Sequence, residues 1–160
     1  MGSSTPGVSV REATAADIDG LVASGTALFM EDGAARDRLR NSGWPKAHAA
    51  DYEAGNLADP DMLVLVAEHD GTVIGHLTGG FYAASVMWTA ARADLVSLHV
   101  MAPWRGQNVG ARLVGRFKSW AKDRGAVQLR VTAYTANQDA IRFYQRQGFA
   151  PLESTFALDI

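Results

Sequence analysis

The feature that most constrains the fold is the stretch SLHVMAPWRGQNVGARLVGRF, residues 97–117. Alternating apolar residues predict a strand over Asp94–Met101, and an amphipathic pattern predicts a helix over Asn108–Arg124. A short basic loop that contains glycine joins the two. The amides of a first helical turn lack partners within the helix and favour an anion, so this arrangement is typical of a phosphate or pyrophosphate site.

The residues of the connecting loop fit such a site. Arg105 supplies a cation with forked donors. Gly106 and Gly110 leave room where backbone must approach a ligand, and Asn108 tolerates a left-handed backbone better than most residues. Neither GxxxxGK[ST] nor GxGxxG after the first strand occurs, so a P-loop nucleotide hydrolase and a dinucleotide-binding fold are not supported.

The rest of the chain predicts strands and helices that alternate irregularly. Asp70-Gly71 is a hairpin signal between two strands, and Thr14 with Asp17 resembles a capping box that opens a first helix. The expected strands are 8–12, 62–69, 72–82, 94–101, 127–133 and 152–158, and the expected helices begin near 15, 44, 108 and 137. We therefore predict an α/β fold of the mixed α+β kind. Its mixed central sheet would have about six to seven strands flanked by helices on both faces, in one domain over 8–160 after a flexible N-terminus, 1–7.

Composition excludes several classes of protein. The 160 residues include no cysteine, which excludes disulfides, cysteine-based metal centres and a cysteine nucleophile. The formal net charge of −2 does not favour a nucleic-acid partner. No apolar run approaches the roughly 18 residues of a membrane span, and the first seven residues do not resemble a signal peptide, so we expect a cytoplasmic protein without a membrane partner. The four histidines have no paired spacing, and we expect no metal.

A second motif, NQDAIRFYQRQGF over 137–149, follows one strand after the first. Together the two motifs resemble the GNAT superfamily of acyl-CoA-dependent N-acetyltransferases. RGQNVGA is similar to that family's [RQ]-x-x-G-x-[GA] loop, although Asn108 stands at the first glycine position. The second motif is similar to the family's N-x-x-A-x-x-x-Y-x-x-x-G-F helix, through Asn137, Ala140, Tyr144, Gly148 and Phe149.

The resemblance implies an acetyl-CoA site and assigns residues to it. The pantetheine arm would pair with the backbone of the strand around His99 as an added strand does. Asn137 would both cap its helix and bind the pantetheine. The implied acetyl-CoA-binding residues are Leu98, His99, Val100, Arg105, Gly106, Gln107, Asn108, Val109, Gly110, Ala111, Asn137 and Tyr144.

Two catalytic residues are predicted. Tyr144 is the candidate general acid, since a phenol with a reference pKa near 10 can protonate a leaving thiolate. Asp94 is the candidate general base, with His99, His76 or water as alternatives. If the strand is regular, Asp94 shares a face with Leu98 and Val100, while Ser97 and His99 share the other. The acidic pair Glu31-Asp32 could attract a cationic amine or could simply be a solvated helix end.

The expected activity is that of a transferase, an acyltransferase that moves an acetyl group from acetyl-CoA to a primary amine. Without cysteine, no cysteinyl acyl-enzyme can form, so direct attack in a ternary complex is expected. A small-molecule acceptor is favoured over a protein or peptide amine. The alternatives are a non-catalytic acyl-CoA-binding regulatory module and an unrelated phosphate-binding α/β domain. The resemblance also raises a homodimer as an expectation.

Overall fold

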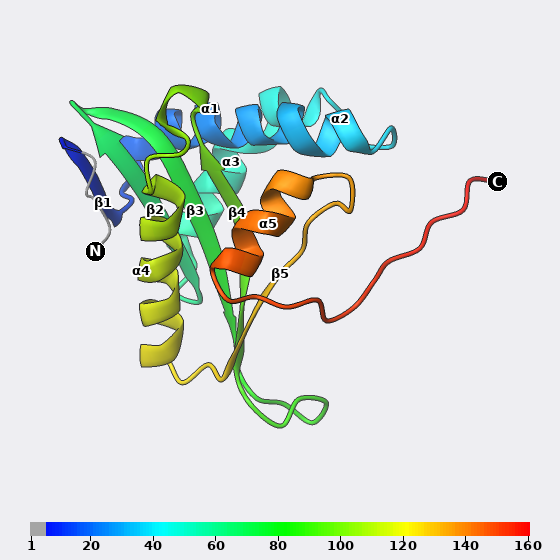
Figure 1. Ribbon diagram of the computed structural model, residues 1–160. Helices are drawn as coiled ribbons and strands as arrows, with labels where there is room; N and C mark the ends of the chain where they lie inside the picture. The colour runs from blue at the N-terminus through cyan, green and yellow to red at the C-terminus, as the bar shows by residue number, and fades with distance from the viewer. Residues whose placement is uncertain (1–5) are drawn as a thin grey trace.

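A five-stranded mixed sheet forms the centre of the computed structural model, which describes residues 6–160 (Figure 1). Residues 1–5 of the predicted flexible N-terminus lie outside the described residues. Neighbouring strands follow chain order, and all pairs are antiparallel except the last, which is parallel. The strands are β1 (Val8–Glu12), β2 (Met62–His69), β3 (Thr72–Tyr82), β4 (Arg92–Val100) and β5 (Gln128–Val131).

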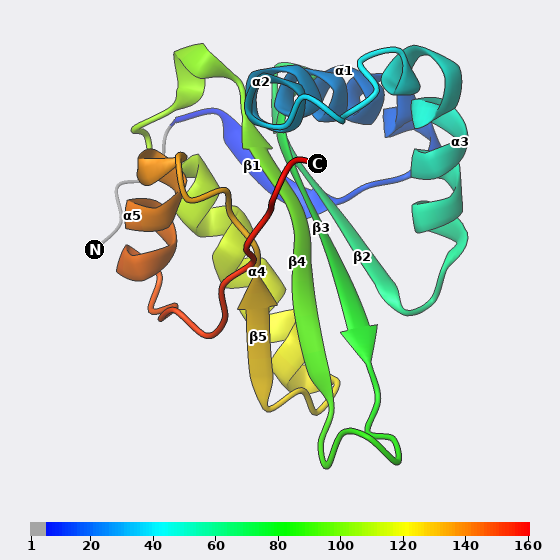
Figure 2. The same cartoon turned by 90° about the vertical axis from the view of Figure 1, so that its right-hand side faces the viewer.

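Helices cover both faces of this sheet, as predicted (Figure 2). The first and third helices pack on one face, and the fourth packs on the other. A single π-helical turn, Phe29–Gly33, separates the first helix from the short second one. The helices are α1 (Ile18–Leu28), α2 (Ala34–Arg36), α3 (Trp44–Ala58), α4 (Val109–Asp123) and α5 (Gln138–Arg146).

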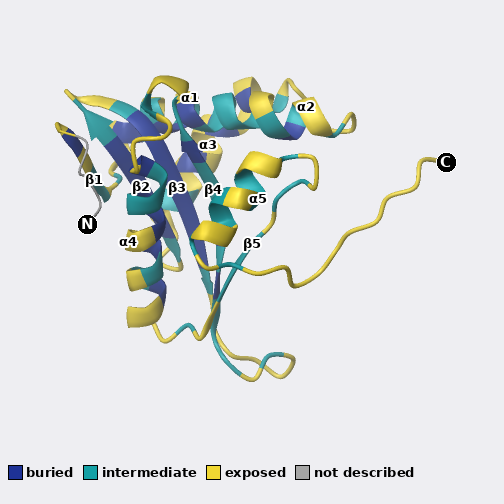
Figure 3. Ribbon diagram, viewed as in Figure 1, coloured by how far each residue is buried: buried dark blue, intermediate teal, exposed yellow. Residues whose placement is uncertain are grey.

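The larger part of the core lies between the sheet and α4. Because side chains alternate along a strand, one side of β2 faces this core while the other side faces α1. Figure 3 shows the central strands buried and the outer surfaces of α4 and α5 exposed. The largest fully buried side chains of the α4 layer are Leu65, Leu77, Val109, Leu113, Val114 and Phe117.

Local signals in the sequence predicted several connections correctly. The β2–β3 hairpin turns at Asp70 and Gly71. Their φ angles of 48° and 77° lie in the left-handed region, which this dipeptide favours. The capping box forms at the start of the first helix, where the Thr14 amide donates to Asp17 Oδ2 at 2.8 Å. Arg11 also pairs with Asp17 and lowers the pKa of that carboxyl, so the cap is held to β1.

The predicted number of strands is wrong, because residues 152–158 form no strand. The alternating apolar pattern of this segment fits a strand, but a strand also needs a partner edge, and this segment pairs with none in the described part of the chain. The sheet therefore has five strands rather than six to seven. No helix within residues 6–160 is long and apolar enough to cross a membrane.

Candidate active site

The last two strands pair over only part of their length. The parallel ladder runs from Arg92–Gln128 to Leu95–Val131, whereas β4 continues to Val100. Beyond Leu95, the described residues supply no strand on this side of β4, and α5 lies beside this part of the sheet (Figure 2). The unpaired backbone is the edge along which the resemblance to the GNAT superfamily places the pantetheine arm.

A β-bulge at Val96 changes which residues share a face of β4. Thr78 pairs with Ser97 and Gly79 pairs with Leu95, so Val96 is an extra residue in β4. As a result, Asp94 shares a face with Ser97 and His99, which contradicts the face expected for a regular strand. That face is the one covered by α1.

Leu98 and Val100 lie on the opposite face of β4, where they pack against the α4 core. Val96 itself is exposed and carries no titratable group. Any contact that Leu98, His99 and Val100 make with a pantetheine would therefore use the backbone.

The carboxylate of Asp94 has a buried oxygen, Oδ1, that makes no hydrogen bond within the described residues. The hydroxyl of Thr78, which lies on the same face, is also buried without a partner there. Buried polar groups without a partner are rare in folded proteins, and each one calls for an explanation. Both groups keep unused hydrogen-bonding capacity on the face of β4 that α1 covers.

The loop between β4 and α4 has the backbone expected of an anion site. Asn108 is the N-cap of α4 and has a φ of 67°, in the left-handed region that asparagine tolerates better than most residues. Gly106 also has a left-handed φ, 74°, and a Cβ there would meet no atom within 4 Å. The backbone angle, and not crowding within the protein, therefore explains why position 106 is a glycine. Val109 and Ala111 follow in the first turn, where amides lack helical partners.

Gly110 has a different role within the fold. A Cβ at this position would lie 3.3 Å from Phe143 Cζ, so the glycine permits close contact between α4 and α5. Gln107 donates from Nε2 to the carbonyl of Pro103 at 2.9 Å and helps to close the loop.

Arg105 points back across the end of β4 rather than away from the protein. Its Nε donates to the Val100 carbonyl at 2.8 Å, and its Nη2 lies 2.6 Å from Glu31 Oε2 and 3.2 Å from His99 Nε2. Burial alone would raise the pKa of Glu31, but the hydrogen bond and charge of Arg105, with His99 nearby, lower it overall. The carboxylate and the guanidinium are each about half exposed, so the ion pair can open towards an anionic ligand.

Behind this ion pair, three buried side chains and the partly buried Ser97 form a hydrogen-bonded chain. Ser24 Oγ lies 3.1 Å from His99 Nδ1 and 2.7 Å from His76 Nδ1, and His76 Nε2 lies 3.0 Å from Ser97 Oγ. Because Arg105 can only donate, His99 Nε2 accepts from it and His99 Nδ1 must carry the proton. The direction then follows: His99 donates to Ser24, Ser24 to His76, and His76 to Ser97.

Burial keeps both imidazoles of this chain neutral. Desolvation, with a smaller contribution from His99, lowers the pKa of His76 to about 3. Desolvation also lowers the pKa of His99, against the opposing effect of Glu31. Sequence analysis proposed both histidines as alternative bases, and the structure joins them in one network. Ser24 was missed, since a single serine within a helix gives no signal in the sequence.

The second motif supplies another part of the site. Asn137 caps α5, as predicted, by accepting from the Ala140 amide at 3.1 Å, and its Nδ2 donates to Asp32 Oδ1 at 3.0 Å. Burial, followed by the charge of Asp32, raises the pKa of Tyr144 to about 12, so the phenol keeps its proton at neutral pH. Asp32 also pairs with Arg36 at 2.6 Å.

The π-helical turn therefore joins the two motifs, because Glu31 contacts Arg105 and Asp32 contacts Asn137. Single π-helical turns recur at functional sites. In the described part of the chain, no hydrogen bond links Asp94 to the Glu31–Arg105 pair or to the Asp32–Asn137 pair. Residues 6–160 contain no group of three or more His, Cys, Asp or Glu side chains that could hold a metal ion.

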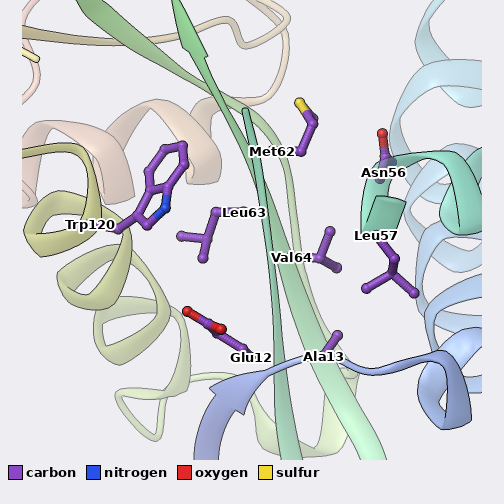
Figure 4. A pocket seen from close by; sticks show the side chains of 8 residues that line it. All are labelled: Glu12, Ala13, Asn56, Leu57, Met62, Leu63, Val64 and Trp120. Carbon is purple, nitrogen blue, oxygen red and sulfur yellow. The ribbon is translucent and has the colours of Figure 1, made fainter. Parts of the chain in front are cut away.

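A cavity of about 220 Å³ lies elsewhere, along the start of β2 (Figure 4). It opens where β1 leaves the sheet, and Asn56 and Trp120 face it from α3 and α4. None of the predicted site residues lines it. We therefore place the candidate site at β4 and not at this cavity.

Known proteins resemble this chain in sequence and in fold. The sequence model of the Acetyltransferase (GNAT) family matches residues 30–149. The aminoalkylphosphonate N-acetyltransferase of Salmonella typhimurium is 31% identical over 98 residues, which cover 60% of this chain and 62% of that protein. The thialysine N-epsilon-acetyltransferase of Mus musculus is 28% identical over 89 residues, covering 55% of this chain and 51% of that protein. The chain thus matches less than two thirds of the length of these relatives.

Solved structures share the fold over nearly the whole chain. A transcriptional regulator from Bacillus halodurans superposes with a TM-score of 0.76 at 24% identity, covering 96% of this chain and 99% of that one. An aminoglycoside N-acetyltransferase in complex with CoA superposes with a TM-score of 0.77 at 16% identity, covering 100% of this chain and 99% of that one.

Proposed function

The chain belongs to the GNAT family of acetyltransferases, and we propose that it transfers an acetyl group from acetyl-CoA to a primary amine. We assign this activity to residues 8–160 and favour a small-molecule acceptor. The observation that carries the proposal is the free side of β4 beyond Leu95, which leads to the N-terminus of α4 through a loop with two left-handed residues. A reducing compartment such as the cytoplasm agrees with the absence of cysteine.

The β4–α4 loop would hold the pyrophosphate of acetyl-CoA. The first-turn amides of α4, with Val109, Gly110 and Ala111, offer donors and the positive end of a helix dipole. Arg105 would exchange part of its contact with Glu31 for the phosphate charge. The backbone of β4 around His99 would pair with the pantetheine amides, and Asn137 would contact the same arm.

The chemistry proposed for the site is a direct transfer. The amine nitrogen bonds to the acetyl carbon while the carbon–sulfur bond breaks, and backbone amides of β4 polarise the carbonyl. Tyr144 gives its phenolic proton to the departing sulfur. Asp94, which has an unpartnered oxygen, takes a proton from the amine. Proton exchange with solvent then removes the proton from Asp94 and returns one to Tyr144, so that protons balance over one turnover.

Acidic groups support a cationic acceptor. Glu31 and Asp32 lie on the π-helical turn that follows α1. Asp94 lies on the face of β4 that α1 covers. Two relatives act on amine-bearing small molecules according to their names, an aminoalkylphosphonate and thialysine. Both are consistent with a primary amine as the acceptor.

The proposal is tested by calorimetry with acetyl-CoA and by a thiol-release assay over a panel of amines. The panel contains aminoalkylphosphonates, thialysine, aminoglycosides and peptides with a free N-terminus. We expect binding of acetyl-CoA, and thiol release with at least one small amine, with an acetylated product seen by mass spectrometry. Binding without release from any amine would favour a regulatory acyl-CoA-binding module, and acetylation of peptides alone would make the acceptor a protein. Absence of binding would contradict the proposal.

A further inference from the structure

Two arginines and two aromatic rings meet at the start of β4, and the proposed mechanism uses none of them. The guanidinium carbon of Arg92 lies 4.2 Å from the centre of the Trp88 ring and 4.8 Å from that of the Tyr82 ring. The guanidinium carbon of Arg130 lies 4.8 Å from the centre of the same Trp88 ring. We call these four residues the arginine cluster. Two positive charges therefore lie beside one indole ring, whose face attracts them but does not neutralise them.

The arginine cluster lies on the same face of the sheet as Asp94, the candidate base. Arg92 and Asp94 are alternate residues of β4, and the residues on either side of Asp94 pack in the α4 core. Arg130 is the register partner of Asp94 in the parallel ladder, and its own neighbours in β5 also pack in that core. Figure 2 looks onto the opposite face, where α1 crosses the upper part and no helix of the described residues covers the lower part of β4 and β5. All three charged side chains therefore project from this uncovered part of the sheet.

Both arginines lack an acidic partner within residues 6–160. Arg130 donates from Nε to the neutral Gln128 Oε1 at 3.0 Å, and Arg92 Nε is buried without a partner. The Nη nitrogens of both side chains make no hydrogen bond in this part of the chain and are not buried, so solvent reaches them. Asp94 forms no ion pair with either arginine there. A guanidinium cannot lose its proton in a protein, so both charges remain available to an anion.

Another arginine of the chain shows what a purely structural contact with aromatic rings contains. Arg124 lies over the rings of Phe81 and Trp120, at 4.7 Å and 5.1 Å from their centres. Its Nη2 pairs with Asp61 at 2.6 Å, and its Nη1 donates to the Pro60 carbonyl at 2.7 Å. The chain itself therefore supplies partners for this guanidinium. The arginine cluster has similar rings but no acid, which leaves its charge for a ligand.

We propose that the arginine cluster binds an anionic group of the acceptor, so that the acceptor is a small amine that also carries a phosphonate or carboxylate group. This inference rests on the proposed function, which places the amine at Asp94. Arg92 and Asp94 are two residues apart along β4, or about 6–7 Å. A chain of a few bonds between the amine and the anion spans that distance. Phosphonate and carboxylate oxygens both accept the paired N–H donors of arginine.

The two contacts together would orient the acceptor on the sheet. Its ammonium group would meet the carboxylate of Asp94 while its anion meets the arginine cluster, so that each end of the molecule has one place. A neutral amine would make only the first contact. The side chain of a protein lysine carries no anion at this distance and would leave both arginines unpaired. The cluster therefore favours a small acceptor with charges of both signs.

Calorimetry on the full chain in the presence of CoA tests binding alone, because CoA has no acetyl group to transfer. The probes are aminoethylphosphonate, β-alanine and β-alaninamide, which share an amine and a two-carbon spacer and differ in the group at the other end. We expect at least one of the two anionic probes to bind about tenfold or more tightly than the amide, since hydrogen bonds between charged groups are the strong ones. The comparison of phosphonate with carboxylate identifies the preferred anion. Equal affinity for all three probes, or no binding of either anionic probe, overturns the proposal.

Variants of the two arginines then test which groups hold the anion. We expect Arg92→Gln and Arg130→Gln each to weaken binding of the anionic probe by about tenfold, and the double variant by about 100-fold, with the amide unaffected. Arg130→Lys keeps the charge and should retain part of the affinity. Arg124→Gln is the matched control and should leave all affinities unchanged. An equal loss for the amide would mean that the arginines only hold the 83–91 loop, and the proposal would be wrong.

Thiol release from acetyl-CoA separates this inference from the proposed function. For the anionic amine, the arginine variants should raise KM by the same factor as they weaken binding and keep kcat within a few-fold. If the anionic probes bind through the arginines but no amine releases thiol, the proposed activity is wrong and the anion site stands. If transfer proceeds equally well with β-alaninamide, the anion site is wrong and the activity stands. Far-UV circular dichroism confirms that every variant is folded.

Discussion

At the scale of single residues, the surroundings of Tyr144 determine what its hydroxyl can do. Burial and the neighbouring Asp32 raise the pKa of Tyr144 to about 12, which keeps the proton on the phenol at every pH where the protein would work. A protonated phenol can donate a proton but cannot accept one, and its raised pKa makes it a weaker acid than an exposed tyrosine. Asn137, whose amide binds Asp32, fixes the carboxylate that contributes to this shift.

We predict that Tyr144→Phe lowers kcat by about 10²–10⁴-fold, because general-acid assistance is typically worth that much. Affinity for acetyl-CoA should stay within a few-fold, since only the hydroxyl is removed. Tyr52→Phe, on the exposed side of α3, is the matched control and should leave both quantities unchanged. Steady-state kinetics and calorimetry measure the two effects, and an unchanged kcat with chemistry rate-limiting would remove Tyr144 from the acid role.

Asp94 leads to a prediction about pH. If this carboxylate is the base, Asp94→Asn reduces kcat more near neutral pH than at high pH, where more of the amine is already deprotonated. Asp70→Asn, at the hairpin turn, is the control for loss of a carboxylate. The pH profile of kcat is the measurement. An equal loss at every pH would argue against Asp94, and an effect confined to KM would instead indicate a contact with the substrate ammonium.

At the scale of elements, α4 combines two requirements at its N-terminus. Its amides must remain accessible to an anion, and its first turn must lie close to α5. Gly110 meets the second requirement, because a Cβ there would lie 3.3 Å from Phe143. The left-handed residues Gly106 and Asn108 direct the loop so that the helix begins at Val109.

We predict that Gly110→Glu abolishes binding of acetyl-CoA, because the new carboxylate stands at the anion site and its side chain crowds α5. Gly115→Glu tests the same substitution further along the same helix, where a Cβ meets no atom within 4 Å. That control should keep its affinity. Calorimetry on both folded variants decides the matter, and equal affinities would contradict the assignment of the loop.

At the scale of the whole molecule, stability depends on pH through the buried histidines. The folded pKa of His76 is about 3, well below the value near 6.5 expected in an unfolded chain. Between these two values, the unfolded state binds more protons than the folded state, so stability rises with pH. The stabilisation is complete above about pH 6.5 and is lost as the pH falls towards 3. The pKa of His99 is lowered too, which acts in the same direction.

We predict that acidification from pH 7 to pH 5 costs about 2 kcal/mol of unfolding free energy through His76 alone. For a chain of this size, this corresponds to a Tm lower by roughly 4–8 °C. His76→Gln should flatten this part of the pH dependence, whereas His48→Gln, at an exposed position, should not. Thermal unfolding at a series of pH values measures both. The same slope in wild type and His76→Gln would show that His76 does not cause it.

Much of this protein is determined by the sequence alone, because the relevant signals act between near neighbours. The turn at Asp70-Gly71, the cap at Asn137 and the amphipathic face of α4 depend on backbone preferences and on side-chain spacing within one element. For the same reason, the two motifs that indicate an acetyl-CoA site could be located without coordinates. Each occupies a single continuous stretch of chain.

Only the tertiary structure decided how these stretches face one another. The bulge at Val96 results from pairing with β3, and this one extra residue places Asp94 beside Ser97 and His99 rather than beside Leu98. The chain from Ser97 to His99 through Ser24 forms because α1 packs over β3 and β4, which no local pattern specifies. The missing sixth strand has a similar cause. A strand sequence over 152–158 specifies an extended chain with one apolar face, but a strand also needs a partner edge outside the segment, and none of the described strands pairs with it.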